Sequence, residues 1–333
     1  MKRREFITLI GSAAASPLMA RAQQPAKMKR IAMVSPSEPV ANMVASYHRF
    51  YRAFFDEVSR LGYVEGKNLV VERYSGGGQI DRLAQLARDV VQTNPEVIFA
   101  LDSQTALQFK STTTTIPIVA LTGDPVAVGL VSNIARPGGN ITGVASDAGV
   151  GLFGKLFEIL REALPKLSNV CAIGPRSLWD GPYGHSIREK AKDAGISLRA
   201  AVLDGKIDEA EYQRVFAEIE QDRPDALLVG AAGVNFTNRV TIVELAAKHR
   251  LPAMYTWRDA VEIGGLIAYS FDLAGMARNG AEQVGKILGG TNPGDIPIYQ
   301  ATHYELAINL KTAKQLGLEL PATLVGRADL VIE

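Results

Sequence analysis

The strongest constraint on the fold is a regular alternation of short β-rich runs and amphipathic helical stretches. Residues 31–34 have the pattern of a buried strand, and the apolar side chains of residues 47–61 then recur at helical spacing. The alternation continues to about residue 144 and begins again near residue 152. Strands that alternate with helices form parallel sheets covered by helices on both faces. The sequence therefore predicts an α/β protein with two doubly wound, Rossmann-like lobes that divide near residue 145.

Length and composition agree with two packed lobes and exclude some functions. The chain has 333 residues, of which 47% are hydrophobic, and its formal net charge is +1. A nucleic-acid-binding protein should carry a basic surplus, so we expect no nucleic-acid partner. The single cysteine, Cys171, excludes an intramolecular disulfide and a cysteine-based zinc site. It lies in the apolar run 170–173, and we expect it to be buried.

The first 22 residues have the layout of a bacterial secretory signal. Basic residues at positions 2–4 precede an apolar, small-residue stretch at 6–20, and residues 20–22 fit a small-x-small cleavage site. The double arginine within the basic start resembles the twin-arginine pattern. The alternative is a single membrane anchor, but the apolar stretch is short for a span of about 20 residues and contains Pro17. We therefore expect residues 1–22 to be a signal peptide and the mature chain to be periplasmic.

The expected sheets also indicate where a ligand would bind. In open parallel sheets, ligands bind beyond the carboxyl ends of the strands. Several of the loops found there lead into helices, whose free N–H groups favour anions. The loops that follow the expected strands are 35–42, 75–79, 101–105, 122–127, 174–183, 230–237, 255–259 and 270–274. The residues predicted to contact a ligand are Ser35, Asp102, Ser103, Thr105, Asp124, Phe236, Tyr255, Trp257 and Asp272.

Each of these candidates also has a structural alternative. Asp102 and Ser103 offer polar groups to a ligand, or one of them caps the helix that follows. Asp124 pairs with a ligand ammonium or caps its own turn, and Asp272 is a second candidate partner for a cation. The aromatic candidates suit a cyclic or aromatic ligand, or they pack between the domains.

Sequence motifs of common enzymes are missing. The chain has no phosphate-binding loop, no dinucleotide fingerprint, no nucleophile elbow and no H-E-x-x-H pair. Its four histidines are scattered, and we expect them to be structural or exposed. The sequence therefore predicts a protein that is not an enzyme and that needs no cofactor or metal.

Several segments resemble the ABC-transporter substrate-binding proteins of the tryptophan-binding type. The segments that carry this resemblance are 62–68, 124–126, 129–131, 136–143, 242–252, 306–313 and 327–329. The resemblance covers essentially the whole chain. It implies a type I periplasmic-binding-protein fold, with two lobes joined at a hinge and a ligand cleft between them.

In such a fold the chain crosses the hinge more than once. We therefore expect residues 29–144 and about 266–300 to form the N-terminal lobe, and residues 145–265 to form the C-terminal lobe. The tail, residues 301–333, is expected to pack across the hinge.

The resemblance implies a monomeric, periplasmic solute-binding protein of an ABC importer. Such a protein captures a small organic solute, such as an amino acid or aromatic compound, by lobe closure and passes it to a membrane permease. The loops 101–105, 175–180 and 230–235 depart from the family pattern, so the identity of the ligand does not carry over. The alternatives are a periplasmic ligand-sensing protein that feeds a receptor, and an α/β enzyme such as an oxidoreductase.

Overall fold

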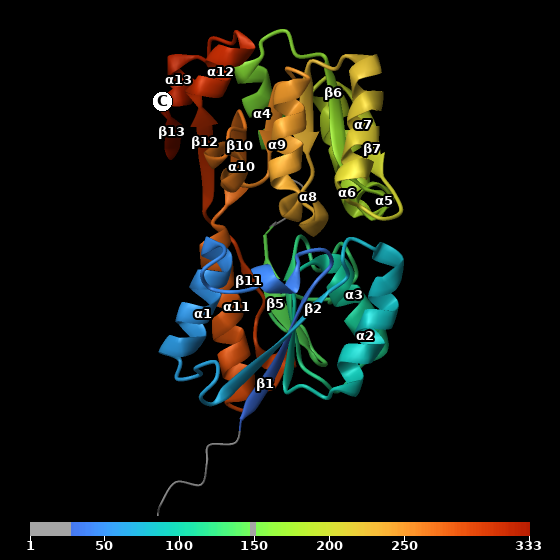
Figure 1. Ribbon diagram of the computed structural model, residues 1–333, viewed down its shortest axis with the longest axis vertical. Helices are drawn as coiled ribbons and strands as arrows, with labels where there is room; N and C mark the ends of the chain where they lie inside the picture. Colours follow the sequence, from blue (N-terminus) through green and yellow to red (C-terminus); the bar gives the residue numbers. More distant parts are fainter. Residues whose placement is uncertain (1–27, 147–150) are drawn as a thin grey trace, which may run out of the picture.

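Each half of the molecule is built on one β-sheet, and the two halves lie end to end (Figure 1). The structure is a computed structural model that describes residues 28–146 and 151–333. The expected signal peptide lies outside the described residues. We call the half that begins with β1 (Lys29–Ser35) the N-terminal lobe, and the half that contains β6 (Asn169–Pro175) the C-terminal lobe.

The described residues of the N-terminal lobe form a parallel sheet of six strands in the order β11-β5-β4-β3-β1-β2. Its further strands are β2 (Leu69–Ser75), β3 (Val97–Ala100), β4 (Ile118–Thr122), β5 (Ile141–Ala145) and β11 (Tyr299–Gln300). Its helices are α1 (Arg49–Arg60), α2 (Leu83–Gln92), α3 (Ser103–Thr112) and α11 (Leu273–Leu288), with short 3-10 helices at Val40–Asn42, Ile80–Arg82 and Pro293–Asp295.

Two apolar cores lie on the two faces of this sheet. Helices α1 and α11 pack on one face, where the ring of Phe54 stacks on that of Phe99 with their centroids 4.8 Å apart. Helices α2 and α3 cover the other face, where Phe109 is fully buried. Neighbouring strand residues such as Ile98 and Phe99 point to opposite faces, which is why these strands read as continuous apolar runs.

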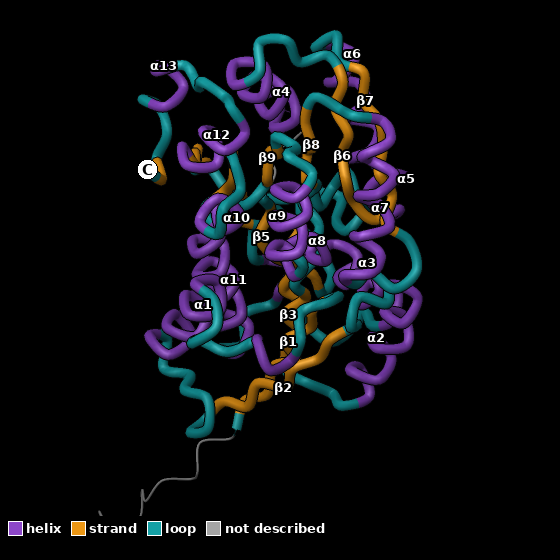
Figure 2. Tube along the Cα trace, turned by 45° about the horizontal axis from the view of Figure 1, so that its top comes forward, coloured by secondary structure: helices purple, strands orange, loops and turns teal. Residues whose placement is uncertain are grey.

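The described residues of the C-terminal lobe form a sheet of seven strands in the order β13-β12-β10-β9-β8-β6-β7, in which β12 runs antiparallel to β10. Its further strands are β7 (Ser197–Leu203), β8 (Ala226–Val229), β9 (Ala253–Tyr255), β10 (Ile267–Phe271), β12 (Tyr304–Asn309) and β13 (Leu330–Ile332). Its helices are α4 (Gly151–Ala163), α5 (Arg176–Asp180), α6 (Pro182–Asp193), α7 (Glu209–Asp222), α8 (Gly233–Thr237), α9 (Arg239–Lys248), α10 (Arg258–Glu262), α12 (Leu310–Leu316) and α13 (Ala322–Val325). Figure 2 shows helices on both sides of this sheet.

The chain crosses between the lobes three times along its described course, after β5, after β10 and after β11. The expected assignment of residues 266–300 to the N-terminal lobe needs correction, because β10 lies between β9 and β12 in the C-terminal sheet. Only four residues separate α10 from β10, so the chain remains in the lobe that it has been building. Helix α11 and strand β11, in contrast, do belong to the N-terminal lobe.

The tail does not pack across the hinge as expected. Residues 304–332 supply β12, α12, α13 and β13, which complete the C-terminal lobe. Ile308 and Leu324 are fully buried in its core, and this burial holds the tail on that lobe. Cys171 is buried in the same lobe, as predicted. None of the helices in the described part of the chain has the length and apolar character needed to span a membrane.

Gly143 lies where two neighbouring strands pack closely, and replacing it tests this packing. A Cβ atom at this position would lie 2.1 Å from the backbone oxygen of Ala120 on β4, so a side chain would force the strands apart. We expect Gly143→Ala to lower the free energy of unfolding by about 1–3 kcal/mol or more, measured by urea denaturation. Gly154→Ala on α4 is the control, because a Cβ atom there meets its nearest neighbour only at 3.9 Å. It should be neutral or stabilising by up to about 1 kcal/mol. Equal effects of the two changes would contradict this packing argument.

Candidate functional site

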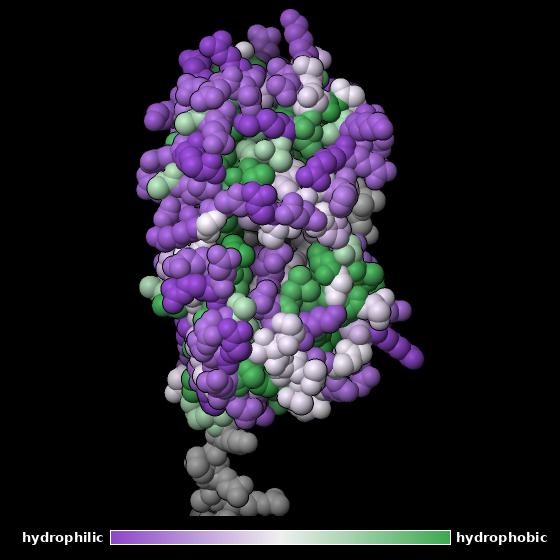
Figure 3. Space-filling view, turned by 90° about the vertical axis from the view of Figure 1, so that its right-hand side faces the viewer, coloured by the Kyte–Doolittle hydropathy of each residue, from purple (hydrophilic) through white to green (hydrophobic). Residues whose placement is uncertain are grey.

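A cavity of about 330 Å³ lies between the two lobes. Its walls are formed where the carboxyl ends of strands from both sheets face one another, as expected for open parallel sheets. Seven of the eight loops that follow the expected strands contribute residues to it; the loop 75–79 does not. The space-filling view shows hydrophobic side chains gathered on the N-terminal lobe beside the line where the lobes meet (Figure 3).

Five of the nine predicted site residues line this cavity: Ser35, Asp102, Ser103, Phe236 and Trp257. The first three come from the N-terminal lobe, and the two aromatic residues come from the C-terminal lobe. The rings of Phe236 and Trp257 meet edge to face, with their centroids 5.4 Å apart. Both lobes therefore contribute predicted residues to the cavity, polar ones from the N-terminal lobe and aromatic ones from the C-terminal lobe.

Two predicted acidic residues do not face the cavity. The Asp124 carboxylate accepts the backbone N–H groups of Val126 and Ala127, both at 2.9 Å, so it caps its own turn. This is the structural alternative that the sequence left open. Asp272 pairs with Arg278 on α11, with 3.3 Å between the carboxylate oxygen and the guanidinium nitrogen.

Two further predicted residues lie behind the cavity wall. Thr105 is 2% exposed, and its N–H and hydroxyl groups donate to Asp102. Tyr255, the last residue of β9, is 2% exposed and points into the core of the C-terminal lobe. Burial raises the pKa of its hydroxyl above the ordinary value. The residues that follow it, Thr256 and Trp257, line the cavity instead.

Asp102 lies at the N-terminus of α3 and is the most perturbed acid of the cavity. Its Oδ1 accepts the N–H of Thr105 at 2.9 Å, so it caps the helix. Burial raises the pKa of Asp102 above its ordinary value, although N–H groups of Thr105, Gln104 and Gly233 favour the charged form. Gly233 belongs to the C-terminal lobe, so both lobes contribute to the burial and the hydrogen bonding of this carboxyl.

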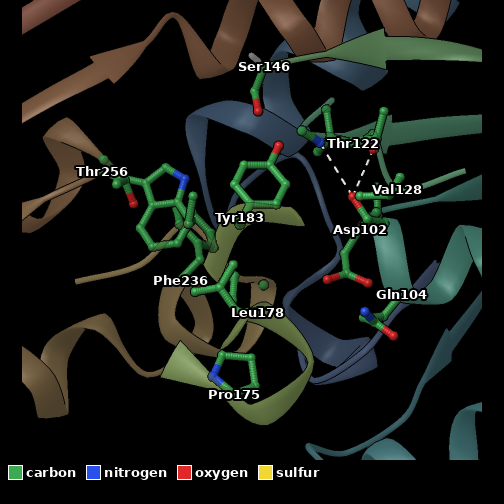
Figure 4. A pocket seen from close by; sticks show the side chains of 18 of the residues that line it. Asp102, Gln104, Thr122, Val128, Ser146, Pro175, Leu178, Tyr183, Phe236 and Thr256 are labelled. Atoms are coloured by element: carbon green, nitrogen blue, oxygen red, sulfur yellow. Dashed lines mark hydrogen bonds between the residues drawn. The ribbon is translucent and has the colours of Figure 1, made fainter. Parts of the chain in front are cut away.

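A short polar network lies next to Asp102. The hydroxyl groups of Ser103 and Thr122 are 2.7 Å apart, and the N–H of Gly123 donates to the Ser103 hydroxyl at 3.3 Å (Figure 4, dashed lines). These contacts hold the first turn of α3 against the end of β4. They present hydroxyl groups, which can donate or accept hydrogen bonds, to a bound molecule.

Several residues that line the cavity were not among the predicted site residues, and Glu38 and Tyr183 are two of them. Glu38 is 3% exposed; its carboxylate accepts from Asn42 at 2.7 Å and from the Thr237 hydroxyl at 3.3 Å. Both residues lie in loops that the strand-end rule selected. The rule carries no information on which side chains of a loop face inward, and Glu38 had no other signal.

Tyr183 approaches the N-terminal lobe very closely. Its hydroxyl oxygen accepts the backbone N–H of Asp124 at 2.6 Å. A Cβ atom on Gly123 would lie 1.4 Å from the same oxygen, so only glycine leaves room for this approach. The contact ties α6 of one lobe to the end of β4 in the other.

The lobes are also joined by a buried ion pair. His48 Nδ1 accepts the N–H of Phe50, so Nε2 carries the proton and donates to Asp259 Oδ1 at 2.5 Å. Arg49 donates to the second oxygen of Asp259 at 2.8 Å. Burial opposes ionisation of Asp259, but the hydrogen bond from His48 and the charge of Arg49 outweigh it and lower the pKa of this carboxyl. His48 and Arg49 lie at the start of α1, whereas Asp259 lies on α10, so the contact joins the two lobes.

A metal centre is not among the possible functions of the described residues. Within 28–146 and 151–333, no three His, Cys, Asp or Glu side chains are grouped so that they could hold a metal ion.

The chain is similar in sequence to known proteins. The chain matches the family model described as ABC transporter substrate binding protein over residues 44–332. A tyrosine-binding protein of Clostridioides difficile (strain R20291) is 22% identical over 271 residues, which cover 80% of this chain and 76% of that protein.

Solved structures confirm the predicted fold class. A conserved domain protein from Vibrio cholerae matches with a TM-score of 0.79 at 25% identity, and the match covers 92% of this chain and 100% of that one. An ABC domain from Streptococcus pneumonia, solved in complex with L-Trp, matches with a TM-score of 0.78 at 19% identity and the same coverage.

The raised pKa of Asp102 predicts a specific pH dependence of stability. The folded protein binds the Asp102 proton more tightly than the unfolded chain, so the free energy of unfolding falls as the pH rises from about 4 through the folded pKa. Asp102→Asn keeps an acceptor for Thr105 but carries no charge. We expect this variant to be more stable than the wild type at pH 7, with a difference that shrinks as the pH falls toward 4. Urea denaturation over this range measures the effect, and a difference independent of pH would contradict it.

Asp259 should control how far the lobes separate. Asp259→Asn removes the charge that His48 and Arg49 hold across the lobes, at a cost to closure of about 1.5–3 kcal/mol. We expect a larger radius of gyration by small-angle X-ray scattering. Asp225→Asn is the control, because the Asp225 carboxylate accepts hydrogen bonds from Ser168 and Asn169 of its own lobe. A radius unchanged by Asp259→Asn would show that this ion pair does not hold the lobes together.

Proposed function

We propose, from the premise that this chain belongs to the family of ABC transporter substrate-binding proteins, that it captures a small aromatic or cyclic solute in the cavity between its lobes. Capture for transport is the role of the family. The aromatic character of the solute, and capture by closure of the lobes, are the finer steps of the proposal.

The observation that carries the proposal is the cavity itself. Its volume of about 330 Å³ is at the small end of ligand pockets, which run from about 300 to 1,000 Å³. Aromatic side chains from both lobes line it, and they bind the faces and edges of ring systems well. These aromatic residues are Phe50, Tyr51, Phe153, Tyr183, Phe236, Trp257 and Phe271. The proteins from C. difficile and S. pneumonia, described as a tyrosine-binding protein and as a complex with L-Trp, support a ring-bearing solute.

A ligand between the lobes stabilises the closed state because it contacts both of them. Closure then depends on the difference between the ligand's affinities for the closed and the open state. Ser35 and Ser103 would contact the ligand from the N-terminal lobe, and Phe236 and Trp257 from the C-terminal lobe. A membrane permease would recognise the closed form and receive the solute.

The proposal also includes export. The layout of residues 1–22 supports a signal peptide and a periplasmic mature chain, in keeping with a family whose members act outside the cytoplasm. Delivery to a receptor instead of a permease remains the second function that this architecture supports, because the same closure can signal ligand binding.

Replacing Phe236 tests whether the aromatic side chains of the cavity bind the solute. We expect aromatic amines and amino acids, screened by thermal shift, to include solutes that raise the melting temperature of the wild type. Phe236→Ala should weaken the best of them about 10- to 100-fold in calorimetry, because a buried aromatic contact of about 1.5–3 kcal/mol is lost. Tyr299→Ala is the control, since Tyr299 is exposed and does not line the cavity. The proposal fails if no solute shifts the melting temperature and native mass spectrometry finds no retained ligand.

A further inference from the structure

The charges that line the cavity are of one sign. Among the described residues that line it, Glu38 and Asp102 carry carboxyl groups, and none is lysine, arginine or histidine. Arg239 lies close by, but its guanidinium stacks on the ring of Phe236 at 4.6 Å and donates to the backbone oxygen of that residue. It does not line the cavity. A ligand carboxylate would therefore meet two like charges and no opposite one.

One position suited to a ligand carboxylate, the start of α3, is already occupied. The free N–H groups at the start of a helix favour an anion, and α3 begins at the cavity wall. Here the anion is the chain's own Asp102, whose Oδ1 accepts from the N–H and the hydroxyl of Thr105 at 2.9 and 3.2 Å. The N–H of Gln104 also favours this carboxylate. A ligand carboxylate cannot use these donors without displacing Asp102.

The carboxylate of Glu38 is the second one in the cavity that has no cationic partner among the described residues. It is 3% exposed, and its hydrogen bonds come from two neutral groups, the Asn42 amide and the Thr237 hydroxyl. No ion pair involves Glu38 or Asp102 in the part of the chain that the structure describes. A buried charge without a partner is costly, so a ligand cation beside either residue would offset the cost.

The remaining walls suit the rest of a cationic, ring-bearing molecule. The Asp102 carboxylate and the Gln104 amide lie on one side of the cavity, and Phe236 and Leu178 lie on the opposite side (Figure 4). Aromatic faces also attract cations, so the ring-lined walls do not oppose a positive group. A molecule with an ammonium group at one end and a ring at the other matches this division.

We propose that the cavity selects an aromatic or cyclic amine without a free carboxylate over the corresponding amino acid or carboxylic acid. The inference rests on the proposed function, because it names the class of solute that is captured. Glu38 and Asp102 hold the ammonium group, and the aromatic walls hold the ring. Asp102 has a second effect, because its carboxylate keeps a ligand carboxylate away from the start of α3.

Two matched sets of compounds test this selectivity. The first set is tyramine, tyrosine and 3-(4-hydroxyphenyl)propionate, and the second is tryptamine, tryptophan and indole-3-propionate. Each set keeps one ring and changes only the charged groups. Isothermal titration calorimetry of the mature wild-type chain at pH 7.5 should show an amine that binds at least tenfold more tightly than its amino acid, and no binding of the acids.

Variants of Asp102 separate its two effects. Asp102→Asn removes the charge and keeps an acceptor for Thr105, so amine affinity should fall at least tenfold while the acids still do not bind. Asp102→Ala also frees N–H groups at the start of α3, because alanine has no side-chain acceptor, so the amino acid should now bind at least as tightly as the amine. Glu38→Gln should weaken the amine alone. Asp124→Asn is the matched control and should change nothing, because that carboxylate caps its own turn. Circular dichroism and urea denaturation confirm that each variant folds.

The possible results separate this inference from the proposed function. If an amino acid or an acid binds the wild type more tightly than its amine, the inference is wrong and the proposed function stands. The same holds if native mass spectrometry finds a retained ligand that has a carboxylate or lacks an amine. If all Asp102 variants keep wild-type selectivity, this carboxylate does not determine which charged groups of a ligand the cavity accepts, and the inference is again wrong. If nothing binds and nothing is retained, both proposals fail.

Discussion

The direction of the parallel strands determines where everything else in this molecule lies. Both sheets place the carboxyl ends of their central strands at the interface between the lobes, so the loops that follow β1, β3, β4, β6, β8 and β9 all reach one cavity. The starts of α3, α5 and α8 collect there for the same reason, because these helices follow β3, β6 and β8. The cavity is thus a consequence of strand direction and does not depend on any single side chain.

The three crossings of the chain allow the lobes to move relative to one another without losing their cores. Each lobe has its own apolar clusters on both faces of its sheet. The contacts between the lobes include polar ones, such as those of Asp259 with its partners on α1 and of Tyr183 with the backbone of Asp124. They also include aromatic ones, such as the ring of Phe236 against that of His48. Polar contacts of this kind exchange with water at modest net cost. Closure can therefore be reversible while each lobe stays intact.

The sequence predicted the layers of the fold well because the apolar periodicity reports burial directly. It predicted the loops of the site for the same reason, since loops follow strands. It did not predict the lobe of β10, because a strand buried on both faces has the same apolar pattern in either sheet. Predictions of single site residues failed where the loop backbone determines the direction of a side chain. Tyr255 ends its strand in the core, whereas Trp257, only two residues later, lines the cavity.

Asp102 links the electrostatics of the cavity to the closure of the lobes. The carboxyl group belongs to the N-terminal lobe, but Gly233, which packs beside it, belongs to the C-terminal lobe. When the lobes approach, the exposure of this group to water falls, and without a cation its charged form is disfavoured. The closed state without ligand is therefore penalised. A bound ammonium group removes that penalty only when the lobes are closed around it, and this difference between the states is what a closure mechanism requires. The same carboxylate that selects the charge of the solute thereby makes closure depend on the solute's presence.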